Sequence, residues 1–152
     1  MYAIGESELL ACCGSREWVK QMKQQEPFAG AEQLLEAAGR TWWKLGREDW
    51  LQAFASHPRI GESSRDARAR QEQSGVRGAP AETLAKLAAA NRAYEKRFGY
   101  IYIVCASGRT AAEMLAMLES RLSNDAATEL RIAAEQQRQI TRLRLQKLLE
   151  DQ

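Results

Sequence analysis

A chain of 152 residues and 17.1 kDa is long enough to bury a core as one domain, and we expect a single domain over residues 1–152. Its 22 Lys and Arg residues nearly balance its 20 Asp and Glu residues, so the net charge is only +2. Because the basic residues are interleaved with acidic ones, this balance argues against a nucleic-acid-binding protein.

Apolar residues at helical spacing predict three helices in the first third of the chain. The first is expected from Ser7 to about residue 22, the second over 31–45, and the third, a short one, from Asp49. The third helix must end near His57, because Pro58 disfavours helical backbone at the residue that precedes it.

His57 is the only histidine of the chain. At a helix C-terminus, the negative end of the helix dipole favours the protonated imidazole, and Pro58 fixes the backbone that follows. Glu72 and Gln73 come on the next predicted element, and an imidazole with a carboxylate is a minimal acid–base pair. A His57 that only caps the carbonyls of its helix is equally compatible with the sequence.

The middle of the chain contains two further predicted helices and one segment of another kind. A helix is expected from Ser64 or Asp66 to Gln73, and a long one from Pro80 to Phe98, where Gly99 is the natural stop. The run at 100–106 is β-branched and aromatic, and it could be a short strand, a buried extended segment or part of a helix. With no second strand candidate to pair with it, we expect no sheet. If it is extended, its backbone groups need other partners, and a bound ligand could be one of them.

Two capping sequences predict the last helices. Thr110 and Glu113 form a capping box that begins a helix to about residue 122. Asn124 and Asp125 cap the last and longest helix. The whole pattern predicts an all-α fold, a compact single-domain bundle of about seven or eight helices.

The last helix carries two kinds of charged residue. Charges that alternate in sign along it are typical of a solvent-exposed face; these residues are Glu129, Arg131, Glu135 and Arg138. Arg142 and Arg144 instead lie among leucines. We expect at least one of them to point inward and to need an anionic partner in the protein or in a ligand.

The cysteines and the hydropathy exclude further classes of protein. Cys12 and Cys13 are adjacent and Cys105 lies in an apolar run, which indicates buried or free thiols in a reducing compartment. With one histidine and no CxxC pair, we expect no metal site. No apolar stretch approaches twenty residues and no leader pattern is present, so we expect a soluble, cytoplasmic protein that does not bind membranes.

Several motifs, in order along the chain, resemble those of the OHCU decarboxylases. They are HPRIG at 57–61, EQSG at 72–75, NRAYEKRFGY at 91–100 and SGR at 107–109, with further matches at 121–124, 129–130 and 143–145. These enzymes act on 2-oxo-4-hydroxy-4-carboxy-5-ureidoimidazoline (OHCU), in the last step of uric acid breakdown to (S)-allantoin. The resemblance implies an all-α, cofactor-free enzyme that acts on this small molecule and is commonly a homodimer.

The resemblance also implies roles for individual residues. His57 matches the catalytic histidine of the family and Glu72 its catalytic carboxylate. Gln73 matches the amide that holds the substrate, and Pro58 packs at the same pocket. Three further residues would contact the heterocycle through their backbone groups: Ile103, Val104 and Cys105. Two arginines, Arg144 and Arg109, are candidates for binding the anionic groups, with Arg144 ranked slightly ahead because its motif is flanked by apolar residues.

One position departs from the family. Relatives often have a serine three residues before the glutamate, where this chain has Ala69. The hydrogen bond of that serine to the ligand should be absent or replaced by Arg68 or Ser64. A lost neutral hydrogen bond costs roughly 0.5–1.5 kcal/mol, enough to weaken binding without removing activity.

Two other functions fit parts of the sequence. A hydrolase or lyase of another ureido compound could use the same His57 and Glu72 to activate water. A non-catalytic helical interaction domain would use His57 only as a cap and would bind a partner through its last helix.

Overall fold

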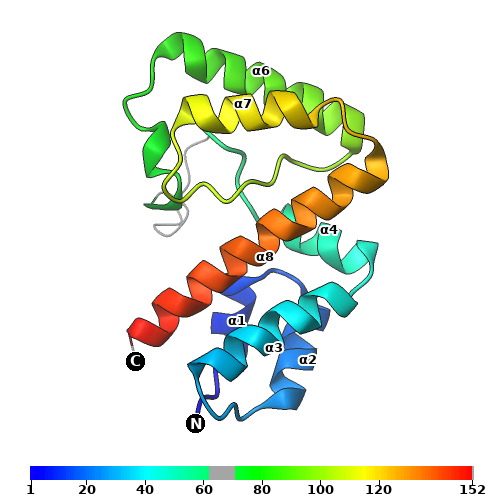
Figure 1. The fold of residues 1–152 in the computed structure, drawn as a ribbon, viewed down its shortest axis with the longest axis vertical. Coiled ribbons are helices and arrows are strands. Elements are labelled where there is room, and N and C mark those ends of the chain that lie inside the picture. The colour runs from blue at the N-terminus through cyan, green and yellow to red at the C-terminus, as the bar shows by residue number, and fades with distance from the viewer. Residues whose placement is uncertain (62–70, 152) are drawn as a thin grey trace. The chain divides into compact units, whose positions relative to one another are not determined.

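The computed structural model describes residues 1–61 and 71–151, and in this part the fold is all-α, as predicted (Figure 1). No β-strand forms among these residues; a single bridge pairs Tyr2 with Phe28. Seven α-helices lie wholly within the described residues: α1 (Glu6–Cys12), α2 (Arg16–Gln25), α3 (Ala31–Lys44), α4 (Arg47–Ala55), α6 (Ala81–Phe98), α7 (Ala111–Arg121) and α8 (Ala126–Glu150), with a short 3-10 helix, η1 (Ser74–Val76). None of these helices is both long and apolar enough to cross a membrane.

The chain divides into two compact units. The first is Met1–Ser56 with Glu135–Gln152, and the second is His57–Ala134. Each is described below by itself, and a single domain over residues 1–152 stays a prediction.

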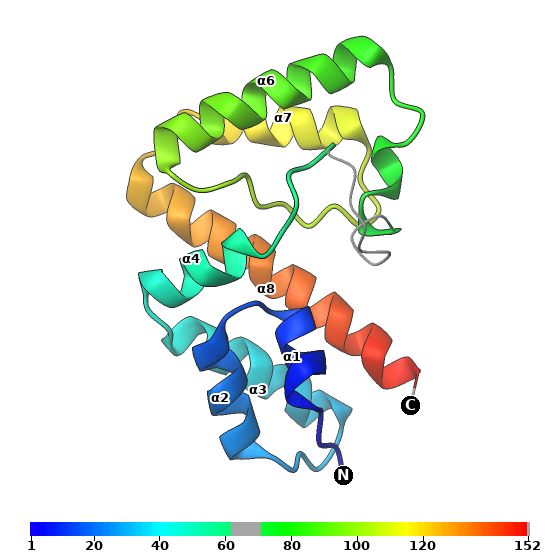
Figure 2. The ribbon, with the colours of Figure 1, turned by 180° about the vertical axis from the view of Figure 1, so that it is seen from behind.

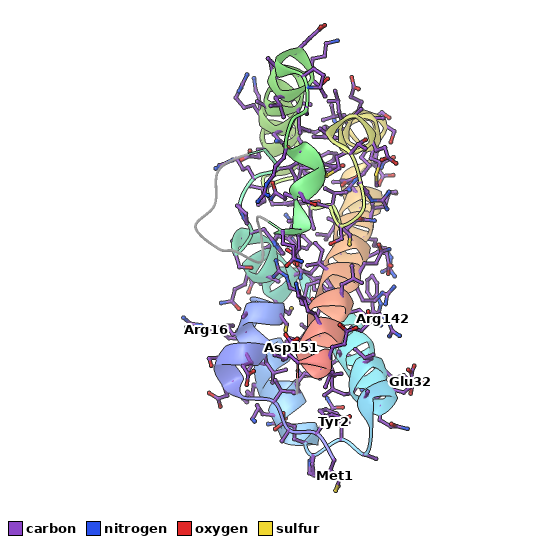
Figure 3. The ribbon with its side chains drawn as sticks, turned by 90° about the vertical axis from the view of Figure 1, so that its left-hand side faces the viewer. Met1, Tyr2, Arg16, Glu32, Arg142 and Asp151 are labelled. Atoms are coloured by element: carbon purple, nitrogen blue, oxygen red, sulfur yellow. The ribbon has the colours of Figure 1, made fainter. Side chains whose placement is uncertain are left out.

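The first unit is built on α1 to α4 and the C-terminal part of α8 (Figure 2). Its core is rich in tryptophan: Trp18 and Trp42 are fully or almost fully buried. Their neighbours satisfy the indole donors, since Trp18 Nε1 donates to the Ala38 carbonyl at 3.1 Å and Trp50 Nε1 to the Trp42 carbonyl at 3.0 Å. Charged side chains such as Arg16 and Glu32 project outward from this unit (Figure 3).

The predicted helix from Ser7 to residue 22 was wrong, because two helices occupy this stretch. Cys13, between α1 and α2, is extended at φ −149° and ψ 116°. Ser15 then caps α2, with its hydroxyl accepting from the Trp18 amide at 3.2 Å. Gly14 lies against Ser56, where a Cβ would come within 2.6 Å of the Ser56 hydroxyl oxygen. The break is therefore set by tertiary packing that helical periodicity does not contain.

The second unit contains α6, α7 and the start of α8, with residues 99–110 running along α7 (Figures 1 and 2). The predicted start of a helix at Ser64 or Asp66 lies outside the described residues, and the predicted boundaries at Gly99, Thr110 and Asp125 are confirmed. Gly99 ends α6 in the left-handed region at φ 84°, which glycine adopts without a steric penalty. Thr110 and Glu113 form both bonds of the capping box at α7, and Asp125 accepts from the Thr128 amide at the start of α8.

One apolar cluster forms the core of the second unit. It takes residues from α6, from α7, from the extended run and from the segment after His57. Its buried members are Ile60, Leu87, Tyr94, Tyr102, Val104, Ala106, Met114 and Leu118. The segments that carry the predicted site therefore rest on a common core.

Candidate active site

The segment that carries His57 is anchored to α6. α4 ends at Ala55, as predicted, and His57 follows two residues later, half-buried. The carbonyl of the buried Ile60 accepts from Asn91 Nδ2 at 3.0 Å. Arg59 binds the Glu95 carboxylate through two bonds of 2.9 and 2.8 Å. The HPRIG and NRAYEK motifs are thus in direct contact, and α6 fixes the backbone just after His57.

The Glu72–Gly75 motif is tied to the same segment. Gln73 accepts, through its side-chain oxygen, from the Gly61 amide at 3.1 Å. This bond closes the loop between the two motifs across 12 residues of sequence. Both Glu72 and Gln73 are half-buried. The side chain that sequence assigned to the substrate also holds the end of the His57 segment.

Gly75 brings this motif against the turn at Arg109. A Cβ built on Gly75 would lie 1.9 Å from the carbonyl oxygen of Arg109, a distance that no side chain tolerates. The backbones of the EQSG and SGR motifs therefore touch at a point that only glycine permits. Arg109 in turn donates from Nε to the Cys105 carbonyl at 3.0 Å.

The run at 102–106 is buried and is neither helix nor strand. Hydrogen bonds that involve side chains fix this run, which has no neighbouring strand in the part of the chain that the structure describes. Tyr102 donates its hydroxyl to the Met114 carbonyl at 2.9 Å, and Arg121 Nη1 donates to the Ile103 carbonyl at 2.8 Å. With the Arg109 bond to Cys105, three side-chain hydrogen bonds fix the segment at residues 102, 103 and 105. The expectation that this run forms no sheet is confirmed for the described residues, and of the alternatives left open by the sequence neither a strand nor a helix is formed.

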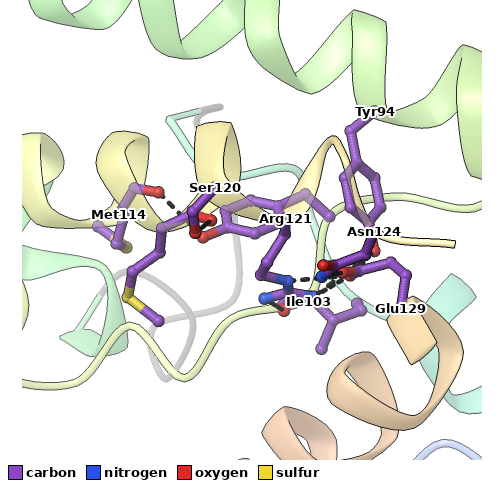
Figure 4. A network of polar contacts seen from close by, with 9 residues as sticks. Tyr94, Ile103, Met114, Ser120, Arg121, Asn124 and Glu129 are labelled. Atoms are coloured by element: carbon purple, nitrogen blue, oxygen red, sulfur yellow. Dashed lines mark hydrogen bonds and ion pairs between the residues drawn. The ribbon is translucent and has the colours of Figure 1, made fainter.

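A buried ion pair lies beside this run (Figure 4). Arg121 is 5% exposed and Glu129 is 0% exposed, and they are joined by bonds of 2.9 and 2.6 Å from Nε and Nη2. Tyr94 donates its hydroxyl to the same carboxylate, and Asn124 Nδ2 donates to its other oxygen at 3.1 Å. The guanidinium carbon lies 4.8 Å from the centre of the Tyr102 ring.

This cluster corrects the prediction for Glu129 and adds Arg121, whose role the sequence analysis did not identify. The solvent-exposed position expected for Glu129 was wrong, because its carboxylate is paired with a guanidinium in the core. Burial opposes the charge on Arg121, but the hydrogen bonds to Glu129 still hold its pKa above its ordinary value. Burial is also the main cause that raises the pKa of Tyr102 to about 12, so its hydroxyl is a donor at neutral pH.

A chain of contacts therefore joins most of the predicted site within the second unit. It runs from the His57 segment through Gln73 and Gly75 to Arg109 and the carbonyl of Cys105, while Arg121 holds the carbonyl of Ile103 in the same run. Pro58, next to His57, is half-buried. Ser64, Arg68 and Ala69, where the departure from the family falls, lie outside the described residues.

Arg144 belongs to the first unit. It is 8% exposed and donates from Nη1 to the Ala11 carbonyl at 3.1 Å. The prediction that Arg142 or Arg144 points inward is confirmed by Arg144.

The described residues contain no group of three His, Cys, Asp or Glu side chains placed to hold a metal ion. All three cysteines are buried thiols outside any disulfide, as predicted, and burial raises the pKa of Cys13 to about 12. A pocket of about 460 Å³ lies beside residues 59–61 and α6. Its described lining does not include His57 or Glu72.

Comparison with known proteins gives one family. A family model for OHCU decarboxylase matches residues 5–146. The chain is 42% identical, over 156 aligned residues and 97% of its length, to a protein of Arabidopsis thaliana named uric acid degradation bifunctional protein TTL, of which it covers 48%. It is 32% identical over 90 residues to a 2-oxo-4-hydroxy-4-carboxy-5-ureidoimidazoline decarboxylase of Amia calva, covering 59% of this chain and 51% of that protein. This chain thus spans about half the length of both relatives.

Two crystal structures share the fold. An OHCU decarboxylase in the presence of (S)-allantoin superposes with a TM-score of 0.87 at 42% identity, over 96% of this chain and 99% of that one. An (S)-allantoin synthase superposes with a TM-score of 0.71 at 19% identity, over 93% of this chain and 48% of that one, which supports the fold alone.

Proposed function

Since this chain belongs to the OHCU decarboxylase family, we propose that it is a carboxy-lyase that converts OHCU to (S)-allantoin in uric acid degradation. The observation that carries the proposal is the similarity, over almost the whole of both chains, to an OHCU decarboxylase crystallised with (S)-allantoin. The contacts among the HPRIG, EQSG, NRAYEK and SGR motifs support it further, because they give these motifs a common location.

The proposed reaction depends on the orientation of the substrate and on the delivery of one proton more than on a cofactor. The substrate carries its carboxylate on a carbon that also bears a hydroxyl group. When the bond to CO2 breaks, its electron pair flows into the imidazolone ring, so the ring takes the part that a cofactor plays in other decarboxylases. The carbon that loses CO2 becomes a carbonyl as its hydroxyl gives up a proton, and one proton must reach one face of the neighbouring, ureido-bearing carbon to give the S product. The protein therefore has to orient the carboxylate, stabilise charge on the ring and direct the proton.

His57 and Glu72 are the proposed catalytic pair. His57 would hydrogen-bond the hydroxyl or carboxylate region of the substrate and manage the proton. Glu72 and Gln73 would accept from N–H groups of the ring and the ureido arm. The bond from the Gly61 amide to Gln73 supports this arrangement, because it ties the motif of the acid to the motif of the histidine.

The remaining proposed contacts recognise the substrate. Pro58 would pack at the pocket, and backbone groups of Ile103, Val104 and Cys105 would contact the heterocycle. Arg144 or Arg109 would bind the anionic groups, because a planar guanidinium matches a carboxylate with two parallel donors. A homodimer and a cytoplasmic location stay predictions that follow from the resemblance and from composition.

The proposal is tested by supplying the substrate freshly, with uricase and hydroxyisourate hydrolase acting on urate, and following optical activity and CO2 together. We expect the purified protein to release CO2 above the spontaneous rate and to give (S)-allantoin in excess of the R form. A ureido hydrolase would consume the substrate without CO2, and an interaction domain would leave the spontaneous, racemic decay unchanged. Either of these results would reject the proposal.

A further inference from the structure

Arg121 has a hydrogen bond to the backbone that its ion pair does not require. Two of its donors, Nε and Nη2, bind Glu129, and the carboxylate receives further bonds from Tyr94 and Asn124. The third donor, Nη1, points to the carbonyl of Ile103 at 2.8 Å. A charged donor makes a stronger hydrogen bond to a buried carbonyl than a neutral donor does.

This bond fixes more than one carbonyl group. The peptide between Ile103 and Val104 is trans and planar, so the carbonyl of Ile103 and the N–H of Val104 point in opposite directions. Holding the carbonyl against Arg121 therefore turns the Val104 N–H to the opposite side of the segment. Arg121 also withdraws electron density from this peptide, which makes the Val104 N–H a better donor.

We propose that Arg121 is a positioning residue that aims the Val104 N–H at the substrate ring. The inference rests on the proposed function, in which the backbone of residues 103–105 contacts the heterocycle. A preorganised N–H matters most where negative charge develops, and here that charge enters the ring as CO2 leaves. Arg121 acts through Ile103 and does not itself touch the substrate.

An ion pair alone would not need arginine. A lysine could neutralise Glu129, but its compact ammonium group lacks the planar fork that reaches Glu129 and Ile103 at once. The Arg121→Lys variant should thus keep the charge pair and lose the bond to Ile103. The proposal predicts a loss of turnover for this variant, whereas a purely electrostatic role for Arg121 predicts nearly full activity.

A double variant separates the contribution of Arg121 to protein stability from its proposed role in positioning the Val104 N–H. Removing one partner of a buried ion pair is destabilising, whereas removing both charges is often tolerated. In Arg121→Met/Glu129→Gln, the glutamine oxygen can still accept from Tyr94, its amide group replaces the oxygen that accepted from Asn124, and the bond to Ile103 is gone. The matched control is Tyr94→Phe, which weakens the same cluster and leaves the bond from Arg121 to Ile103 in place.

Kinetics of (S)-allantoin formation are measured for the folded fraction of each protein, alongside thermal melts. For the double variant we expect kcat to fall roughly 10- to 100-fold, the scale of a misplaced donor, with KM changed little. Tyr94→Phe should melt earlier with kcat close to the wild type. Full kcat in a folded double variant, with wild-type activity present, overturns the role of Arg121 and leaves the decarboxylase assignment standing; an inactive wild type rejects that assignment instead.

A second measurement does not depend on activity. The chain has only three valines, so selective ¹⁵N-valine labelling gives three amide signals, from Val19, Val76 and Val104. On titration of the wild type with (S)-allantoin, we expect the Val104 signal to shift while that of Val19, in α2, stays in place. In Arg121→Lys, or in the double variant where it folds, the shift of Val104 should be lost or strongly reduced. A Val104 signal that ignores the ligand in the wild type, or responds equally in the variants, overturns the inference.

Discussion

His57 gains its proposed catalytic role from where its chain segment is fixed. Ile60 and Arg59, just after it, are held by Asn91 and Glu95 of α6. The imidazole is therefore carried on a short backbone segment whose far end is anchored. Such positioning is what distinguishes a catalytic histidine from a mobile surface residue.

His57→Asn keeps a polar side chain of similar size and removes the titrating group. Because general acid–base catalysis contributes 10²–10⁴-fold, we expect kcat for (S)-allantoin formation to drop by about that factor. Circular dichroism and a thermal melt should match the wild type, since the bonds of Arg59 and Ile60 are untouched. Arg16→Ala, at an exposed position, is the control and should retain activity. An enantiomeric excess and rate equal to those of the wild type would contradict the role given to His57.

Arg144 and Arg142 offer a matched pair on one helix. Arg144 is buried and Arg142 is partly exposed. If the Arg144 guanidinium binds the anionic groups of the substrate, Arg144→Lys keeps the charge but loses the planar fork, and KM should rise about 10-fold or more. Arg142→Lys should leave both kcat and KM unchanged. Steady-state kinetics decide between the two candidates: an unaffected Arg144→Lys, together with a raised KM in Arg109→Lys, would transfer the role to Arg109.

The charged residues of α8 also show where a prediction from the local charge pattern is wrong. Glu129 follows the alternation of charge that predicts a solvent face, and Arg131 and Arg138 in the same pattern are exposed or half-exposed. Glu129 differs because Arg121, eight residues earlier, folds back from the end of α7 to meet it. No local pattern contains that contact, because it depends on the turn between α7 and α8.

At the level of elements, the boundaries that depend on neighbouring residues were predictable. The Thr110–Glu113 box, Gly99 after α6 and Asp125 before α8 all act within a few residues of the helix end. The break between α1 and α2 was not predictable, because Gly14 packs on Ser56, 42 positions away (56 − 14). The motifs of the site could be identified from sequence, but the contacts that connect them could not.

The backbone contact between Gly75 and Arg109 can be disrupted by a single substitution. A methyl group at Gly75 would lie 1.9 Å from the carbonyl oxygen of Arg109, and because that oxygen belongs to the backbone, one segment must move. We expect Gly75→Ala to lower kcat/KM at least 10-fold, since displacement of catalytic groups by about 1 Å costs up to 10². Gly46→Ala is the control, because no atom lies within 4 Å of a Cβ at that position. Wild-type kinetics in Gly75→Ala would mean that the packing of these two motifs does not position the site.

The whole molecule raises the question of whether its two compact units are one domain in the thermodynamic sense. α8 contributes to both, since residues up to Ala134 belong to the second unit and those from Glu135 to the first. A helix of 25 residues without a break propagates cooperatively along its length. Loss of packing in one unit should therefore be felt in the other, as a single domain over residues 1–152 requires.

The two units carry separate reporters of unfolding. Val19 lies buried in the first unit and Val104 buried in the second, so their ¹⁵N amide signals follow each unit during a urea titration. If the chain is one cooperative domain, both native signals should disappear with the same midpoint and slope. Leu145→Ala then tests the coupling, because Leu145 is fully buried in the part of α8 that belongs to the first unit.

Truncating a buried leucine costs about 2–5 kcal/mol, so Leu145→Ala should shift the urea midpoint markedly. Coupled units predict an equal shift for Val19 and Val104, although the change lies only in the first unit. Leu143→Ala, on the same helix but 43% exposed, should move neither signal by much. A Val104 midpoint that stays in place while that of Val19 falls would identify two independently stable units. In that case the continuity of α8 would not transmit stability between them.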